Sequence, residues 1–98
     1  MLSPFHLAVP VDNLDAAVHF YGHVLGCQRG RCDTHWVDWN FFGHQLVTHL
    51  VTEMPSLPKH NQVDNHAVPV PHFGVVLNWS DWQALSSKLR ASNMAFII

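Results

Sequence analysis

Residues 6–26 read HLAVPVDNLDAAVHFYGHVLG, and their pattern sets the architecture of the first half of the chain. Apolar residues first alternate with His6 and smaller residues, which predicts a strand with one packed face and one lighter face. Asp12 or Asn13 can cap a following helix, whose apolar residues recur at helical spacing, and Gly26 supplies its end. The apolar positions of this strand and helix are Phe5, Leu7, Val9, Val11, Leu14, Ala17, Val18, Tyr21, Val24 and Leu25.

The residues after this helix favour a meander of three strands. Trp36–Phe42 is rich in β-favouring residues, and Gly43 marks a turn between it and His44–Thr52. We place the remaining strand at Cys27–Arg31. The pattern therefore predicts a βαβββ module over residues 1–52.

The second half of the chain repeats this order after an interruption. Residues 53–70 are rich in proline and polar residues, which predicts a linker or a long loop. Residues 71–98 then predict a strand at Phe73–Leu77, a helix, and the start of another strand at Met94–Ile98. A capping box formed by Ser80 and Gln83 would begin the helix, Trp82, Leu85 and Leu89 would face inward, and Asn93 would end it.

Internal repetition supports two copies of one unit. Sliding the sequence along itself brings His6 onto His72, Val9 onto Val75 and Asp15 onto Asp81. The chain stops on an apolar strand, so a longer protein or another chain is expected to supply the missing strands. We predict an α+β fold in which paired βαβββ modules form a curved, mostly antiparallel mixed sheet, the second module being incomplete here.

Three histidines on predicted strands are candidate metal ligands. His6 is followed two places later by Ala8, and His72 by Gly74, so a small residue beside each imidazole leaves open space on the same face. His49 shares a face with Gln45, Val47 and Val51. Imidazole is a common ligand of divalent metals, although a single histidine at such a position is more often a partly buried sheet residue hydrogen-bonded to its neighbours.

These residues resemble the vicinal oxygen chelate superfamily, which includes glyoxalase I, bleomycin-resistance proteins and type I extradiol dioxygenases. The resemblance is carried by the His6 strand, by NLDAAVHFYGHVLG with Phe20-Tyr21 and Val24-Leu25-Gly26, and by the His72 strand. In that family two βαβββ units surround a divalent metal such as Fe(II), Zn(II), Ni(II) or Mn(II). The resemblance implies a homodimer that acts on a small molecule with two adjacent oxygens.

The resemblance also implies roles for the three histidines. His6 and His72 match the ligands on the first strand of each unit, and His49 falls at or next to the last-strand position of the first unit. A final carboxylate ligand would lie beyond Ile98. His49 is then either a third ligand or a catalytic acid or base, and its imidazole favours dioxygenase-like ring cleavage slightly over glyoxalase-like isomerisation. The alternative is a metal-free binding protein of the bleomycin-resistance kind.

Composition excludes several other functions. Hydrophobic residues make up 48% of the chain and charged residues 12%, which is typical of a folded globular protein. The net charge is −2 and the cationic residues are scattered, so we expect neither nucleic acid nor a membrane surface as partner. No apolar run is long enough to span a bilayer, and the expected location is cytoplasmic, with Cys27 and Cys32 reduced.

Other groupings are weaker candidates. His19 and His23 could clamp a metal from one helix, but a solvated helix face explains the same spacing. The spacing of Cys27, Cys32 and His35 matches no strong zinc template. The aromatic residues Trp36, Trp39, Phe41 and Phe42 could line a substrate pocket, although alternation turns about half of them toward the core. The segment with His60 and His66 could form a lid.

Overall fold

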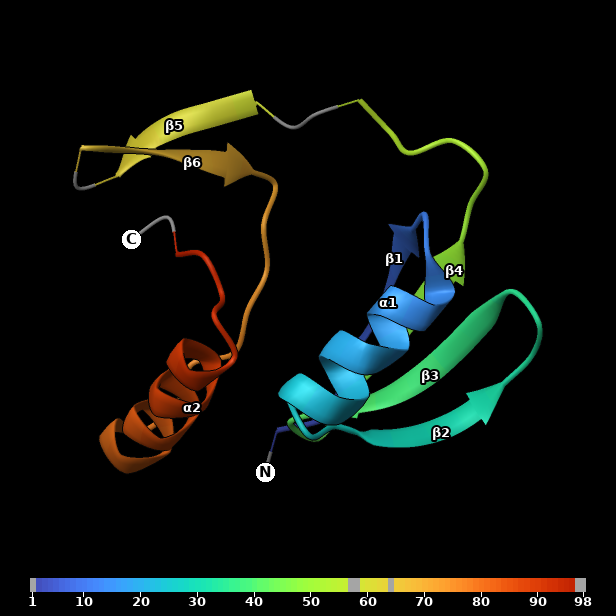
Figure 1. The fold of residues 1–98 in the computed structure, drawn as a ribbon, viewed down its shortest axis with the longest axis horizontal. Helices are drawn as coiled ribbons and strands as arrows, with labels where there is room; N and C mark the ends of the chain where they lie inside the picture. Colours follow the sequence, from blue (N-terminus) through green and yellow to red (C-terminus); the bar gives the residue numbers. More distant parts are fainter. Residues whose placement is uncertain (1, 57–58, 64, 97–98) are drawn as a thin grey trace. The chain divides into compact units, whose positions relative to one another are not determined.

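The computed structural model describes residues 2–56, 59–63 and 65–96, and the chain divides into two compact units, Met1–Pro55 and Ser56–Ile98. Figure 1 shows the elements of each unit along the chain. Both strands and helices are present in a mixed arrangement, which confirms the α+β class predicted from the sequence.

The first unit is a four-stranded sheet crossed by one helical segment. Its strands lie in the order β1-β4-β3-β2; β1 runs parallel to β4, whereas β3 is antiparallel to both β4 and β2. This is the βαβββ order predicted from the sequence. The elements are β1 His6–Val11, α1 Leu14–Val18, η1 His19–Val24, β2 Gln28–Cys32, β3 Trp36–Phe41 and β4 His44–Leu50.

Strand periodicity separates a buried face of this sheet from an open one. On β3, Val37, Trp39 and Phe41 are buried, and between them lie the less buried Trp36, Asp38 and Asn40. Leu46 and Thr48 of β4 pair with Trp39 and Val37, so their side chains join the same buried layer. The first unit therefore has its core on one face of the sheet, and the other face remains available for a site. The buried layer contributed by β3 and β4 consists of Val37, Trp39, Phe41, Leu46 and Thr48.

The helical segment begins and ends where the sequence indicated. The Asn13 side chain accepts a hydrogen bond from the Ala16 N–H at 3.0 Å and caps α1, and Gly26 takes a φ of 73° just after η1. The second part, η1, is a π-helix rather than a continuation of α1. Gly22 in η1 lies against the Trp39 ring, because a Cβ there would be 3.3 Å from Trp39 Cη2.

A tight turn joins β3 to β4. Phe42 and Gly43 both have positive φ angles, 52° and 89°, as a two-residue hairpin turn of the twisted type requires. The turn sets Phe41 opposite His44, and every later pair of the hairpin follows from that register. The turn predicted at Gly43 is confirmed.

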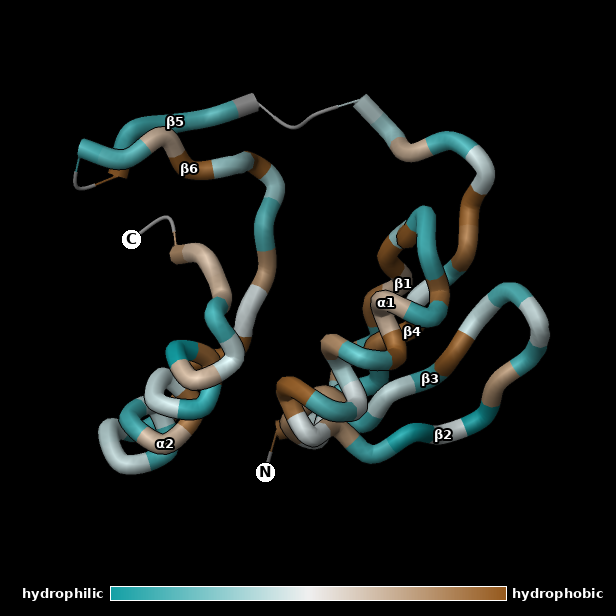
Figure 2. The backbone as a smooth tube through the Cα atoms, in the orientation of Figure 1, coloured by the Kyte–Doolittle hydropathy of each residue, from teal (hydrophilic) through white to brown (hydrophobic). Residues whose placement is uncertain are grey.

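The second unit differs from the predicted copy of the first. It contains a hairpin, β5 Lys59–Val63 with β6 His66–Val70, and a helix, α2 Trp79–Ala91. The hairpin lies in the segment for which we expected no regular element; Asn65, with a φ of 65°, is in its turn. Pro69 is tolerated because a two-stranded ribbon consists only of edge strands. Hydrophilic residues follow one another along both β5 and β2 (Figure 2).

The two strands predicted around α2 are wrong over the described residues. Phe73–Leu77 and Met94–Phe96 are irregular, and the rest of the second predicted strand, residues 97 and 98, lies outside the described part of the chain. A β-favouring sequence forms a strand only when it has a neighbour to pair with, and no described strand pairs with either segment. Val76 is accordingly fully exposed, at 100%.

The start of α2 also differs from the prediction. Asn78, rather than Ser80, is the capping residue, because its side chain accepts a hydrogen bond from the Asp81 N–H at 2.9 Å. The Ser80 hydroxyl instead donates to the Asn78 side chain at 3.1 Å. Asn93 follows the helix with a φ of 59°, as expected of a residue that ends it.

No helix in the described part of the chain has the length and apolar character needed to cross a bilayer.

Replacing Thr48 by valine tests the polar contact inside the core. Thr48 is fully buried, at 0% exposure; its hydroxyl accepts from the Trp39 indole N–H at 3.1 Å and donates to the Val37 carbonyl at 3.3 Å. Thr48→Val leaves the indole N–H without its acceptor and should lower the free energy of unfolding by about 1–3 kcal/mol. Urea denaturation measures the loss. Thr52→Val, at an exposed position, should change it by less than about 0.5 kcal/mol; equal effects of the two variants would contradict this role.

Tyr21 is the single tyrosine of the chain, so titration of its phenol reports on how far this side chain is buried. Burial, with a smaller contribution from Cys27, raises the pKa of Tyr21 above its ordinary value of 10.0. Stability linked to this group is therefore fully present below the unfolded pKa and is lost as the pH rises through the higher folded pKa. Phenolate absorbance of the native protein should increase at a higher pH than that of the urea-unfolded chain, and superimposable curves would contradict the burial.

Candidate functional site

The open face of the first unit's sheet carries a row of polar side chains across three strands. Strand pairing sets His6 beside Gln45, and Gln45 in turn beside Asn40. The next row of the same face contains Val47 and Asp38, which are also directly paired. All of these side chains except Asn40 line a hollow of about 190 Å³. Its lining residues are His6, Arg31, Trp36, Asp38, Gln45, Val47 and His49.

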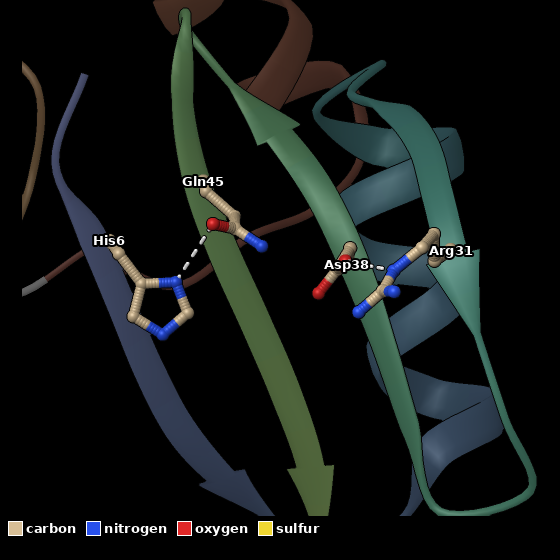
Figure 3. Close-up of polar contacts among 4 residues, drawn as sticks. All are labelled: His6, Arg31, Asp38 and Gln45. Atoms are coloured by element: carbon tan, nitrogen blue, oxygen red, sulfur yellow. Dashed lines mark hydrogen bonds and ion pairs between the residues drawn. The ribbon is translucent and has the colours of Figure 1, made fainter. Parts of the chain in front are cut away.

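His6 is held by Gln45 across the β1–β4 pairing. The His6 Nδ1 atom lies 3.0 Å from Gln45 Oε1, as Figure 3 shows. An amide oxygen can only accept, so Nδ1 carries the hydrogen and donates it. The other ring nitrogen, Nε2, then keeps its lone pair, which is the tautomer that a metal ligand or a general base requires.

Asp38 and Arg31 form an ion pair in the same hollow. The Arg31 Nε atom lies 3.7 Å from Asp38 Oδ2, and the Asp38 side chain is only 13% exposed whereas that of Arg31 is 85% exposed (Figure 3). The Arg31 guanidinium carbon also lies 5.5 Å from the centre of the Trp36 ring, within cation–π range. The positive charge of Arg31 therefore lies over the Trp36 ring.

His49 lies in this hollow too, but away from His6 along the strands. It pairs with Pro10 on β1 and with Trp36 on β3, whereas His6 pairs with Gln45. His49 is four positions beyond Gln45, which corresponds to about 13 Å along β4. The structure thus brings His6 and His49 to one hollow and separates them along it.

His72 belongs to the second unit, and its immediate surroundings resemble those of His6. His72 Nδ1 lies 2.7 Å from the Pro69 carbonyl oxygen, which can only accept. Nδ1 therefore donates, and Nε2 again keeps its lone pair. His72 precedes an irregular segment rather than the predicted strand, so this carbonyl, not a sheet, orients its ring.

A second hollow adjoins the first, because the two share Asp38 and Gln45. Its volume is about 290 Å³. Its other lining residues are Pro4, Gly30, Trp39, Asn40, Gly43 and His44. His44 has a structural role there, since its Nδ1 accepts a hydrogen bond from the Phe5 N–H at 3.0 Å. A ligand longer than the first hollow could therefore continue toward the β3–β4 turn.

The weaker histidine and cysteine groupings lie elsewhere. His19 and His23 sit on η1 with ring centres 5.5 Å apart, both exposed. His60 and His66 are on the β5–β6 hairpin. No disulfide joins Cys27 and Cys32. Within the described ranges, no group of three or more His, Cys, Asp or Glu side chains is placed to hold a metal ion.

The predicted aromatic pocket divides between the two faces of the sheet. Trp36 lines the hollow, whereas Trp39 and Phe41 are buried in the core near Tyr21. Phe42 occupies the turn and is 39% exposed. Alternation along β3 therefore predicted the division correctly.

Sequence reasoning did not single out three polar residues of the hollow. In the sequence, Gln45 stands out only as a neighbour of His49 on the same face, and Asp38 only as part of a β-favouring stretch. A carboxylate between two tryptophans on a half-buried strand is a usable signal, because alternation assigns it to the open face. Arg31 had no such signal, since its place depends on an irregularity of β2.

Comparison with solved structures agrees with this architecture. A glyoxalase/bleomycin resistance protein/dioxygenase from Alicyclobacillus acidocaldarius is 29% identical, with a TM-score of 0.70, over 96% of this chain and 66% of that one. An integron cassette protein from the mobile metagenome of the Halifax Harbour sewage outfall is 22% identical, with a TM-score of 0.69, over 94% of this chain and 72% of that one. The second likeness concerns the fold alone.

A further structure with the same fold is the lactoylglutathione lyase of Agrobacterium tumefaciens. It is 18% identical, with a TM-score of 0.60, over 95% of this chain and 72% of that one. None of the curated proteins matches this chain in sequence. The sequence profile of the glyoxalase/bleomycin resistance protein/dioxygenase superfamily matches residues 3–98. The resemblance seen in the sequence is thereby confirmed, and the chain belongs to the glyoxalase/bleomycin resistance protein/dioxygenase superfamily.

Proposed function

We propose that this chain is part of a divalent-metal-dependent enzyme that acts on a small molecule with two adjacent oxygens. His6 and His72 would hold the metal, together with a carboxylate ligand of the kind that the resemblance implies. When bound, the metal would act as a Lewis acid on the adjacent oxygens, for ring-cleaving dioxygenation or for glyoxalase-like isomerisation. Membership of the superfamily supports the chemical class.

The proposal rests on one observation: the His6 and His72 rings have the same tautomer, with the hydrogen on Nδ1. In both His6 and His72 an oxygen acceptor holds the Nδ1 hydrogen, at 3.0 Å and 2.7 Å, and Nε2 keeps its lone pair. Histidines that bind metals are commonly oriented in this way by a carbonyl or carboxylate on the second nitrogen. An imidazole nitrogen with a lone pair is a ligand type that divalent metals such as Fe(II), Zn(II), Ni(II) and Mn(II) accept, which supports the proposal.

We propose His49 as the acid or base of the reaction rather than a third ligand. Its position about 13 Å along β4 from Gln45 supports a role at the far end of the hollow from His6. Its side chain is exposed, and an imidazole ring has one nitrogen that can donate a proton and one that can accept it, which suits the chemistry of a general acid or base. A homodimer in the cytoplasm is the working form that we expect, and the edge strands β1 and β2 could take part in pairing.

A metal-free binding protein of the bleomycin-resistance kind is the second candidate. The hollow has an apolar wall formed by Trp36 and Val47, which would hold a ligand by contact alone. In that case His6 and His49 would serve only as hydrogen-bonding groups.

Metal titration separates the two functions. After EDTA treatment of the full-length protein, Zn(II), Ni(II), Fe(II) or Mn(II) at a hundredfold excess over Kd should raise the melting temperature by about 10–20 °C. His6→Ala and His72→Ala should each abolish most of the shift, and His35→Ala, an exposed histidine outside the hollow, should retain it. No shift with any metal, or a shift lost in His19→Ala and kept in His6→Ala, would contradict the enzyme proposal.

Gln45→Leu tests how His6 is oriented. Without its acceptor the His6 ring loses the bond that fixes the tautomer, so metal affinity should fall by about 10–100-fold while the fold is retained. Isothermal titration with the tightest-binding metal gives the affinity, and circular dichroism reports the fold. Asn40→Leu, on the same face in the neighbouring strand, is the control and should leave the affinity within about threefold of wild type.

A further inference from the structure

We propose that Arg31 makes the hollow selective for ligands that carry a carboxylate on a flat ring. The proposal deepens the function proposed above, on which it rests for the idea that the hollow receives a substrate. The proposal is based on the position of the Arg31 guanidinium, which depends on an irregularity in the pairing of β2 with β3.

An irregularity in β2 turns Arg31 onto the open face. Gln28 pairs with Asn40 and Arg29 with Trp39, but the next recorded pair joins Cys32 to Val37. Two residues of β2, Gly30 and Arg31, therefore stand opposite the single residue Asp38, which is the arrangement of a β-bulge. With regular pairing Arg31 would be opposite Val37 and would face the core.

Gly30 permits this arrangement. A Cβ at position 30 would lie 3.2 Å from Asp38 Cβ and 3.6 Å from the Asp38 carbonyl oxygen, so the two strands approach more closely than a side chain would comfortably allow. Bulges are common beside functional sites, where they redirect a side chain. Here the redirected side chain is the cation that lines the hollow.

The Arg31 guanidinium keeps most of its binding capacity. Its contact with Asp38 is made through Nε at 3.7 Å, and the two terminal nitrogens lie beyond it (Figure 3). The side chain is 85% exposed, so a ligand can reach it. A guanidinium can bind a carboxylate through two parallel N–H bonds, which an uncharged ligand cannot match.

The surroundings of Arg31 favour a flat anion over a spherical one. Trp36 supplies an aromatic surface 5.5 Å from the guanidinium carbon, and Val47 is apolar. A ring lying against Trp36 would place an attached carboxylate near Arg31, and its remaining substituents would extend toward His6 or His49. The ligand class is therefore an aromatic or conjugated carboxylate.

A purely structural role of Arg31 makes a different prediction. Asp38 is 13% exposed, and Arg31 could serve only to compensate its charge. In that case the loss of Arg31 would weaken anion binding only through the repulsion of Asp38, and removal of the Asp38 charge would restore it. If Arg31 binds the ligand, the double variant Arg31→Ala/Asp38→Asn will not recover the preference.

The test compares protocatechuate, a benzoate with two adjacent hydroxyls, with its neutral primary amide. Their Kd values are measured by isothermal titration with the full-length protein, both metal-loaded and EDTA-treated. Wild type should bind the carboxylate about tenfold more tightly than the amide at low salt, and the ratio should fall as salt screens the exposed charge. Arg31→Ala should bring the ratio to about one without changing the Kd of the amide, and Arg31→Lys should retain a smaller preference.

Arg29→Ala is the matched control, because it removes the same charge from the same strand at a position outside the hollow. It should keep the tenfold ratio. A ratio of one in wild type, a ratio that survives Arg31→Ala or returns in the double variant, or no measurable binding of protocatechuate would overturn the proposal. Metal removal reports separately on the proposed function: if EDTA leaves both Kd values unchanged while the ratio still depends on Arg31, the metal proposal fails and the selectivity proposal stands.

Discussion

The structure of the first unit depends on the pairing of β4 with two neighbours at once. β4 runs parallel to β1 and antiparallel to β3, so each residue from Gln45 to His49 has a fixed partner on both sides. Because side chains alternate between faces, this double register assigns Leu46 and Thr48 to the core and Gln45 and His49 to the open face. A shift of one residue would exchange the two sets. The core and the candidate site are therefore specified by the same hydrogen-bonded ladder.

Much of the first unit could be predicted because its signals are local. The alternation in residues 6–11, the cap at Asn13 and the stop at Gly26 each depend on neighbouring residues, and all three are present in the structure. The division of aromatic residues on β3 follows from the same alternation. What could not be predicted is the bulge in β2, because regular alternation places Arg31 on the wrong face.

The second unit was harder to predict because its strands depend on partners. Phe73–Leu77 has a sequence suited to a sheet, yet a strand also needs a neighbour to accept its hydrogen bonds. The β5–β6 ribbon formed instead from a polar segment with a short turn, where local pairing costs little chain entropy. The sequence indicates His72 as a ligand through a strand pattern that the structure does not contain. Its orientation by the Pro69 carbonyl supplies a different reason to consider it.

The bulge in β2 has a consequence for how relatives of this chain should be compared. One additional residue between Arg29 and Cys32 moves Arg31 from the core face to the open face, so the length of this segment matters as well as the identity of its residues. A relative that keeps an arginine in this strand but lacks the additional residue would direct that arginine toward its core. Insertions and deletions in an edge strand can thus change the charge of a binding surface without any substitution within it.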